Sequence, residues 1–354
     1  MDRYLRNIMN LKRLLTALSD IDYGRYLITS LSDIAWLTGF TGSAALVLLG
    51  GQKPLFISDG RYALLLQTLL GSEWEIEIVK SYSDYLTAIA QNFKKITIQK
   101  QCTYQNYTIL AASGAEICTE CEILSALRAV KTDHEIEAIK REYSIAAEAF
   151  NIALKNFQSG KSELYWAAEL EYEMKALGRA PSFSTIIASG PRGALPHGEP
   201  SEKIISDNDA IVVDFGTKKL YTSDYTRLLS NSSNVEASDI AKIVEESVHA
   251  AKERVKPGAS AKEVDFAARN VIERYGYGEF FNHATGHGVG VDVHEQPTIR
   301  ADSADTLLEN MVFTIEPGIY LPQKLGVRLE DTVRVSADGY EDLSRLDRYI
   351  YPFN

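Results

Sequence analysis

The chain is short of the features that mark membrane, secreted and nucleic-acid-binding proteins. It has only three cysteines in 354 residues, too few for the disulfide framework of a secreted scaffold, which favours a cytoplasmic protein. No run approaches the roughly 18 consecutive apolar residues that a membrane span needs. The net charge of −11, together with the lack of any basic block, argues against nucleic acid as a partner.

Two local features add little to this picture. Residues 1–20 are charged throughout and follow the pattern of an amphipathic helix, without the uninterrupted apolar core of a signal peptide. Cys118 and Cys121 form a single C-x-x-C, and without a second pair or a nearby histidine an incidental spacing is favoured over zinc or redox use. A hydrophobic content of 45% and a charged content of 24% are ordinary for a soluble globular protein.

The texture of the chain changes near residue 125, which predicts two domains, 1–125 and 126–354. The first part alternates strand-like runs with turns, and a Gly50-Gly51 turn joins two of the runs as a hairpin. We expect a small α/β domain there. The predicted strands cover 26–30, 44–49, 54–58, 74–79 and 96–99, with helical stretches near 62–70 and 104–113.

The second part contains two pairs of helices, each followed by strand-like runs. Capping boxes, Thr132 with Glu135 and Ser260 with Glu263, mark the starts of two of these helices. Ser162 opens another helix that ends at Gly178. The remaining predicted helical ranges are 238–255 and 261–275. This repetition suggests one domain built from two similar halves, so the fold class is mixed α/β (α+β).

Three of the six histidines lie in the segment 280–297, which reads FFNHATGHGVGVDVHEQP. Glycines flank His287, the middle one, so the backbone can pack closely on both sides of its ring. An imidazole in such an apolar, glycine-rich setting is well placed to ligate a metal or to meet a substrate. The three histidines are His283, His287 and His294.

The segment allows two other interpretations. A tight glycine turn with an incidental histidine stands at roughly even odds for His287 alone. A dinucleotide-binding loop is rejected because Val291 occupies the position of the third glycine in G-x-G-x-x-G, and no helix follows.

Four acidic residues interrupt strand-like runs that are otherwise apolar. Because both flanks of each run are apolar, at least some of these carboxylates should be buried. Burying an unpaired carboxylate costs several kcal/mol, so a cationic partner is required. The four are Asp214 in IVVDFG, Asp224 in LYTSDYTRLL, Glu316 in VFTIEPG and Glu330 in GVRLEDTV.

Either arginines or metal ions could neutralise these acids. Arg227 and Arg328 lie close in sequence, and for any single acid an internal salt bridge is the simpler explanation. Two bases do not balance four carboxylates, whereas two divalent cations do. With His287 the set offers four oxygen ligands and one nitrogen ligand, which suits Mn²⁺, Co²⁺ or Zn²⁺. The reaction class that fits is metal-assisted hydrolysis of an amide or ester.

These motifs resemble the five-ligand centre of the dinuclear metallopeptidases with the pita-bread fold (family M24). The matching residues are Asp214 and Asp224 in DFG…YTSDYTR, His287 in TGHGVG, Glu316 in TIEPG and Glu330 in RLED. Within that family the chain resembles the proline-specific branch, the Xaa-Pro aminopeptidases and Xaa-Pro dipeptidases (prolidases). The likeness extends to LTGFTGS and DGRY in the first domain and to LRAVKTDHEIEAIK at the start of the second.

The resemblance implies a fold and a reaction. The expected fold is a creatinase/prolidase-like N-terminal domain followed by a pita-bread domain with a pseudo-twofold antiparallel sheet. The expected activity is hydrolysis of the Xaa-Pro bond by a metal-bridging hydroxide, with Mn²⁺ ahead of Co²⁺ or Zn²⁺. Glu316 would be both ligand and proton shuttle. His197 and His294 would be catalytic and substrate-binding, and Arg328 would join the hydrogen-bond network on the substrate side.

Two pocket residues and several open questions complete these expectations. By the same resemblance His283 lies near the pocket for proline, while Tyr320 is a pocket wall or a core residue. Proline-containing peptides are the expected substrates and a homodimer the expected assembly, with the N-terminal domain capping the site. Aminopeptidase and dipeptidase activities both stay open. The alternatives are a creatinase-like hydrolase and a non-catalytic peptide-binding protein, both of which would be expected to lose ligands that this chain keeps.

Overall fold

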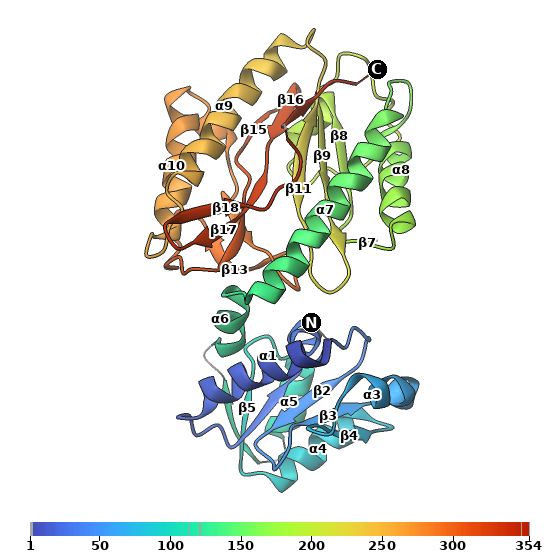
Figure 1. The fold of residues 1–354 in the computed structure, drawn as a ribbon, viewed down its shortest axis with the longest axis vertical. Coiled ribbons are helices and arrows are strands. Elements are labelled where there is room, and N and C mark those ends of the chain that lie inside the picture. The colour runs from blue at the N-terminus through green and yellow to red at the C-terminus, as the bar shows by residue number, and fades with distance from the viewer. Residues whose placement is uncertain (1–2, 113, 120–121, 348, 354) are drawn as a thin grey trace. The chain divides into compact units, whose positions relative to one another are not determined.

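The computed structural model describes residues 3–112, 114–119, 122–347 and 349–353. The chain separates into two compact units, residues 1–128 and 129–354 (Figure 1). Cys118 is a free, partly buried thiol, and Cys121 lies outside the described residues. In the part of the chain that the structure describes, no helix is long and apolar enough to cross a membrane.

The first unit is built on a mixed sheet of six strands in the order β4-β3-β2-β1-β5-β6, in which β2 alone runs antiparallel to its neighbours. The strands are β1 (Arg25–Ile28), β2 (Leu46–Leu49), β3 (Leu55–Ser58), β4 (Glu75–Ile78), β5 (Lys95–Ile98) and β6 (Glu116–Thr119). The helices are α1 (Arg3–Leu18), α2 (Leu31–Thr38), α3 (Ala63–Leu69), α4 (Tyr82–Asn92), α5 (Tyr104–Ala111) and α6 (Ile123–Ala129).

Helix α2 illustrates what the sequence pattern missed in this unit. Ser30 caps its first turn by accepting a hydrogen bond from the Asp33 amide, and Gly39, with φ of 71°, ends it in the left-handed conformation. Its residues from Asp33 to Thr38 are all buried, so the helix has no polar face and shows no amphipathic period.

The second unit begins with a helical pair and a four-stranded sheet. Helices α7 (Asp133–Lys155) and α8 (Glu163–Ala176) precede β8 (Ile186–Ser189), β9 (Ile211–Phe215) and β11 (Tyr225–Leu229), which pair antiparallel, while β19 (Ile350–Tyr351) adds in parallel to β11. Short strands β7 (Ala180–Pro181) and β10 (Thr217–Lys218) form a separate pair. The capping box predicted at Thr132 and Glu135 is present at the start of α7.

The second half of this unit repeats the plan, as the sequence suggested. Helices α9 (Val235–Lys252) and α10 (Ala261–Arg274) precede an antiparallel sheet in the order β13-β12-β14-β17-β18. Its strands are β12 (Gly286–Gly288), β13 (Glu295–Ile299), β14 (Val312–Ile315), β17 (Asp331–Ser336) and β18 (Gly339–Asp342), and β15 (Gly318–Leu321) pairs with β16 (Leu325–Arg328) as a hairpin. The predicted capping box at Ser260 and Glu263 is also present.

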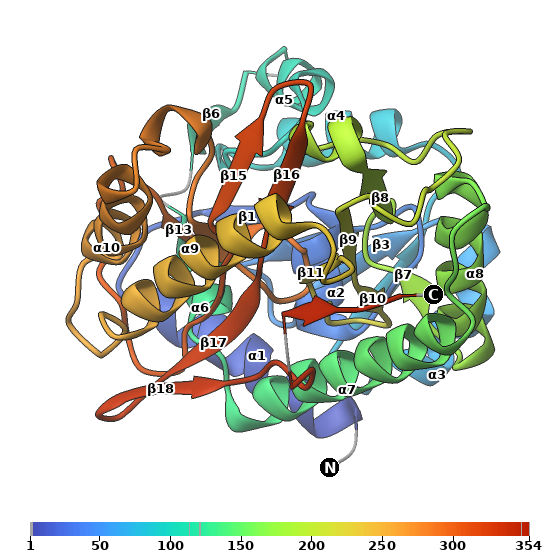
Figure 2. The same ribbon diagram turned by 90° about the horizontal axis from the view of Figure 1, so that it is seen from above.

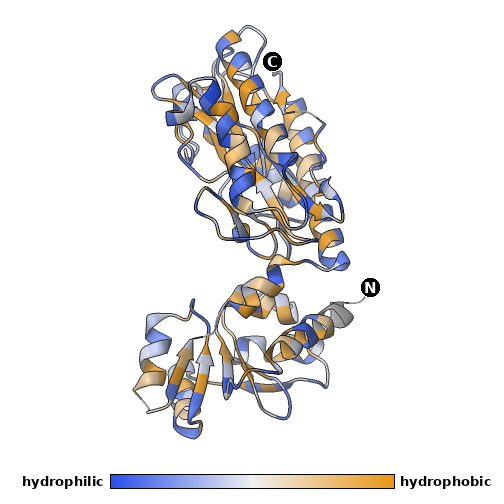
Figure 3. Cartoon of the chain, turned by 90° about the vertical axis from the view of Figure 1, so that its left-hand side faces the viewer, coloured by the Kyte–Doolittle hydropathy of each residue, from blue (hydrophilic) through white to orange (hydrophobic). Residues whose placement is uncertain are grey.

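The views show how these layers are arranged. In Figures 1 and 2, α8 and α10 lie on opposite sides of the strands of the second unit. Figure 3 shows hydrophobic residues along the strands and both kinds of residue on the helices, as expected for helices that bury one face. The mixed fold that the sequence predicts, with a second unit built from two similar halves, is therefore confirmed.

One expectation about the strands was wrong. The sequence places all four acidic residues inside strand-like runs, but only Asp214 lies in a strand; Asp224 precedes β11, and Glu316 and Glu330 lie at breaks. The two breaks have different physical reasons. The Glu316 amide donates to Thr285 O (2.8 Å), in line with the β12–β14 pairing, and the ladder stops at the next residue because Pro317 has no N–H to donate. The Glu330 amide donates to Thr226 O (3.3 Å) of β11, so there the chain bonds to another sheet.

Candidate metal centre and substrate pocket

Three of the predicted ligands meet where β9 and β11 face the break after β16. Asp214 pairs with Thr226 across the antiparallel strands, and Asp224 lies two residues before Thr226, which directs both carboxylates to one face. Glu330 approaches the same face because its amide bonds to Thr226 O. One carboxylate oxygen from each of Asp214, Asp224 and Glu330 lies within 4.8 Å of the others.

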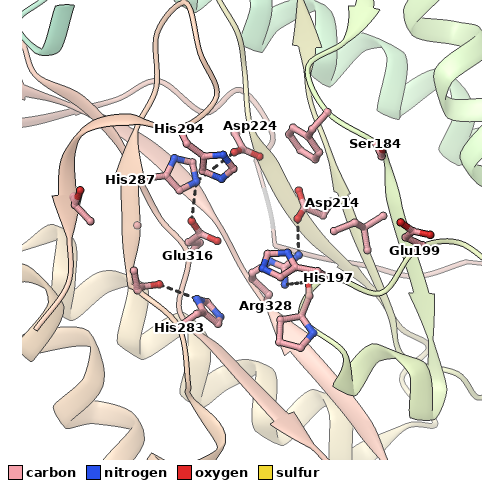
Figure 4. A pocket seen from close by; sticks show the side chains of 16 residues that line it. Ser184, His197, Glu199, Asp214, Asp224, His283, His287, His294, Glu316 and Arg328 are labelled. Atoms are coloured by element: carbon pink, nitrogen blue, oxygen red, sulfur yellow. Dashed lines mark hydrogen bonds and ion pairs between the residues drawn. The ribbon is translucent and has the colours of Figure 1, made fainter. Parts of the chain in front are cut away.

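His287 and Glu316 complete the cluster from the other sheet. Ile315 pairs with Asp331, and Gly318 with Arg328, so Glu316 lies opposite Glu330 between those pairs. His287 Nε2 is 3.1 Å from Glu316 Oε1 and 3.7 Å from Asp224 Oδ2. The structure thus brings all five predicted ligands together; Figure 4 labels four of them around the pocket.

The glycines beside His287 are required by close backbone packing. A Cβ at Gly286 would lie 1.9 Å from Thr314 O, and a Cβ at Gly288 would lie 2.1 Å from Gln296 O. His287 Nδ1 is 3.2 Å from Gly288 O. Because a carbonyl only accepts hydrogen bonds, Nδ1 carries the proton in this contact and Nε2 is left to face the carboxylates.

Burial and mutual repulsion set the charge state of the cluster. Burial, followed by the charge of Glu330, raises the pKa of Asp224 well above its usual value. Burial, followed by the charge of Glu316, does the same for the pKa of Glu330. Burial is the largest influence on Glu316 and opposes its ionisation, but the hydrogen bond to His287 and the charges of His287, His283 and Arg328 together outweigh it and lower the pKa to about 2. The centre is therefore short of positive charge.

Internal salt bridges neutralise only part of this charge. Arg328 Nη2 donates to Asp214 Oδ2, whereas Arg227 turns away and pairs with Asp331 at 2.9 Å. Among the described residues, Asp214 Oδ1 and Glu330 Oε1 are buried without a hydrogen-bond partner. Unpartnered buried carboxylate oxygens facing one another are what a site for divalent cations provides. The residues present therefore fit such ions.

A cavity of about 500 Å³ opens beside this cluster. Besides Glu316, its lining includes four other residues that the resemblance assigns to substrate or catalysis (Figure 4), namely His197, His283, His294 and Arg328. His197 and His294 are exposed to solvent, and the ring centroids of His294 and His287 are 4.2 Å apart. Partial burial, followed by the charge of His287, lowers the pKa of His294.

Tyr320 lies behind the pocket rather than in the described lining. Its hydroxyl accepts a hydrogen bond from Arg328 Nη1 (2.9 Å) and lies 2.8 Å from His283 Nε2. His283 Nδ1 is 2.8 Å from Ala284 O, which can only accept, so Nε2 is the acceptor of the Tyr320 hydroxyl. Burial lowers the pKa of His283 despite the opposing charge of Glu316, and the charge of Arg328 adds to the lowering, which favours this neutral ring.

Three further residues support or line the site; the sequence suggested a supporting or packing role for Thr226 and gave no role at the site to Tyr143 or Glu199. Thr226 Oγ1 donates to Glu330 Oε2 (2.8 Å) and accepts from Arg328 Nε (3.0 Å). The Asp224 amide donates to Tyr143 Oη (3.1 Å), and Glu199 lines the cavity. Tyr143 lies among the buried residues of α7, so the sequence pattern alone indicates a core residue. Glu199 lies two residues after His197, which was the available signal.

Comparison with known sequences agrees with this geometry. The model of metallopeptidase family M24 matches residues 137–337, and that of the creatinase/prolidase N-terminal domain matches residues 10–130. The Xaa-Pro dipeptidase of Pyrococcus horikoshii is 35% identical over 351 residues, covering 97% of this chain and 99% of that protein. The chain belongs to metallopeptidase family M24.

Solved structures share the whole architecture. The Xaa-Pro dipeptidase from Bacillus anthracis matches with a TM-score of 0.90 and 32% identity, covering 98% of this chain and 100% of that one. The X-Pro aminopeptidase from Thermotoga maritima matches with a TM-score of 0.85 and 34% identity, covering 95% and 99%. The fold and the class of enzyme, a metal-dependent hydrolase of peptides, are thereby shown.

Proposed function

We propose that this metallopeptidase hydrolyses the peptide bond that precedes proline, in Xaa-Pro dipeptides or at the N-terminus of longer peptides. The proposal assigns residues 1–125 to an N-terminal domain and residues 126–354 to the catalytic domain. Relatives that align over nearly the full chain carry the names Xaa-Pro dipeptidase and X-Pro aminopeptidase. These names support the proline specificity and leave both substrate lengths within the proposal.

One observation carries the metal dependence. Carboxylates of Asp214, Asp224 and Glu330 converge within 4.8 Å, and two of their buried oxygens have no hydrogen-bond partner among the described residues. We propose that the centre holds two divalent ions, with Mn²⁺ as the first candidate and Co²⁺ or Zn²⁺ as alternatives. The proposed ligands are Asp214, Asp224, His287, Glu316 and Glu330.

The chain's own groups have separate roles in this proposal. Bound divalent ions would lower the pKa of a water molecule and polarise the scissile carbonyl. Glu316 is ionised, since its pKa is about 2, and can accept the proton of the attacking water at its carboxylate and return it to the departing proline nitrogen. His294, neutral and exposed beside His287, can donate a hydrogen bond to the carbonyl oxygen as charge develops.

Arg328 and His283 position groups around the reacting bond. Arg328 binds Asp214 and also donates to Pro196 O (2.9 Å), so it holds a metal ligand and the loop carrying His197 in one arrangement. Both ring nitrogens of His283 are engaged within the protein. His283 therefore offers its ring face and carbons, rather than a hydrogen bond, to the pyrrolidine ring of proline.

The test is turnover after metal removal. Protein stripped by chelation should not hydrolyse Xaa-Pro dipeptides or Xaa-Pro-Xaa tripeptides, and Mn²⁺, Co²⁺ or Zn²⁺ should restore activity on at least one of them. The ratio of the two rates separates dipeptidase from aminopeptidase. Full activity after exhaustive chelation would contradict the metal mechanism and favour a creatinase-like hydrolase, whereas metal binding without turnover of either peptide would favour a binding protein.

A further inference from the structure

Glu199 is a carboxylate in the cavity wall that the proposed metal centre does not use. The other lining carboxylates, Asp214, Asp224 and Glu316, belong to the centre itself. The Glu199 side chain is exposed to the cavity and to solvent, and among the described residues no ion pair or hydrogen bond engages its carboxylate. It is a fixed negative charge on the substrate side of the pocket.

Hydrogen bonds from Arg192 and to Glu163 hold the loop that carries Glu199. Arg192 Nη2 donates to the backbone oxygen of Glu199 (2.5 Å), and Arg192 Nε pairs with Glu163 Oε2 (2.9 Å). Glu163 is fully buried and also accepts from the Ser201 amide (3.1 Å). The nearby guanidinium is thus already balanced by a buried carboxylate, and the loop is held on both sides of Glu199.

The surroundings of Glu199 combine charge with apolar surface. Phe183 and Ile186 line the same cavity. A side chain with a long aliphatic stem and a cationic head matches such a wall, because the stem covers apolar surface while the head reaches the carboxylate. We propose that Glu199 makes the enzyme favour substrates with lysine or arginine before the proline, an inference that rests on the proposed function.

The free amino group of the substrate is a poorer match for Glu199. In Figure 4, Glu199 lies on the far side of Asp214 from His287 and Glu316. The amino group of an Xaa-Pro substrate is one carbon away from the scissile carbonyl, so it must stay close to the proposed metal centre. The cationic head of a lysine or arginine side chain is several bonds further out and can reach the opposite wall.

The experiment compares Lys-Pro with Met-Pro, whose side chains are similarly long but differ in charge. The wild-type Mn²⁺-loaded enzyme should show a higher kcat/KM for Lys-Pro. In Glu199→Gln the ratio of the two kcat/KM values should fall about fivefold, the scale of one partly exposed ion pair, mainly through KM. Raising ionic strength should reduce the wild-type ratio and leave the ratio of the variant nearly constant.

Glu202→Gln is the matched control. Glu202 is an exposed glutamate of the same segment outside the described cavity lining, so its substitution should leave the ratio unchanged. An equal loss on both substrates in Glu199→Gln would show recognition of the amino group and overturn the inference, as would an unchanged ratio. If the wild-type enzyme cleaves neither dipeptide, the same ratio is measured with Lys-Pro-Ala and Met-Pro-Ala; if it cleaves none of the four peptides, the proposed function fails instead.

Discussion

Glu330 and Asp331 are neighbours in sequence and both are buried, yet their surroundings are opposite. The Glu330 carboxylate faces other carboxylates, and burial with the charge of Glu316 raises its pKa well above the usual value. Burial also opposes ionisation of Asp331, but the charges of Arg227 and Lys252 outweigh it and lower its pKa. Asp331 accepts hydrogen bonds from Arg227, Lys252 and Tyr349.

The two residues belong to different charge clusters: a closed cluster around Asp331, in which protein cations pair with the carboxylate, and an open cluster around Glu330, in which carboxylates outnumber the protein's cations. In the cluster around Asp331 the carboxylate is paired with Arg227 and Lys252, and it ties β17 to β11, α9 and the C-terminal segment through protein groups. The cluster around Glu330 has one guanidinium, Arg328, and unpartnered carboxylate oxygens among the described residues. Buried charge of one sign that the protein does not neutralise is the signature of a site for a cation.

The largest expected effect comes from removing a proposed ligand. Asp224→Ala and Glu330→Ala should each lose bound metal and lower kcat/KM by at least about a hundredfold, because a ligand contributes more than the outer partners that cost 10–100-fold. Metal content by elemental analysis and turnover of an Xaa-Pro dipeptide measure the two effects. Wild-type activity and metal content in either variant would show that the substituted residue is not a metal ligand.

A substitution in the closed cluster around Asp331 should lower the stability of the fold and leave the metal content unchanged. Asp331→Asn keeps the packing but leaves Arg227 buried without its anion and Lys252 with Asp342 alone, so it should lower the free energy of unfolding by about 3 kcal/mol or more. Urea unfolding of the metal-loaded protein measures this. Asp239→Asn, in an exposed pair with Lys242, is the control and should not change the midpoint measurably. A loss as small as that of the control would show that the Asp331 cluster is not a stabilising unit.

Thr226 lies between the two regions and should have an intermediate effect. Thr226→Val removes the donor to Glu330 Oε2 and the acceptor for Arg328 Nε, so metal affinity should fall by about tenfold. Calorimetric titration with Mn²⁺ measures this change. Thr68→Val, at an exposed site on α3, should leave the affinity unchanged; equal affinities in the two variants would deny Thr226 a role in orienting Glu330.

The smallest effect is a dependence of stability on pH with opposite signs in the two clusters. The raised pKa values of Asp224 and Glu330 favour their protonated forms in the folded, metal-free protein. This contribution is full below the unfolded value of about 4 and is lost as pH rises through the folded values. The lowered pKa of Asp331 gives stability above about pH 4 that disappears only in stronger acid.

Thermal unfolding of the stripped protein therefore tests the sign directly. Its Tm should rise by about 2–4 °C as pH falls from about 8 to 5.5, whereas the Mn²⁺-saturated protein should not gain stability over that range, because cations have replaced the protons. If the Tm of the metal-free protein stays level or decreases as pH is lowered, the carboxylates of Asp224 and Glu330 are already neutralised by protein groups, as that of Asp331 is.

Local sequence patterns predicted much of the fold, and they predicted that Asp214, Asp224, His287, Glu316 and Glu330 lie together. Capping boxes located the starts of α7 and α10, and apolar periodicity located most helices and strands. The carboxylates were singled out because charge inside apolar runs requires a partner. Helices α2 and α4 were missed: α2 is buried from Asp33 to Thr38 and shows no polar face, whereas the helical spacing of Leu86, Ile89 and Ala90 in α4 was not recognised.

The remaining details depend on contacts that sequence spacing does not encode. Arg227 and Arg328 look equivalent in the sequence, each close to an acid, but Arg328 enters the centre while Arg227 points to the closed cluster. The break at Glu330 arises because its amide bonds to Thr226 O of another sheet, a contact over more than a hundred residues. Glu199 enters the pocket because Arg192 and Glu163 shape its loop.

Anomalous diffraction at the manganese edge, from crystals grown with Mn²⁺, tests the central claim most directly. The account predicts two peaks enclosed by Asp214, Asp224, His287, Glu316 and Glu330, and no peak in the cluster around Asp331. A single ion in that centre would limit the mechanism to mononuclear chemistry. Carboxylates paired only with Arg328 and His287, with no manganese between them, would contradict the account.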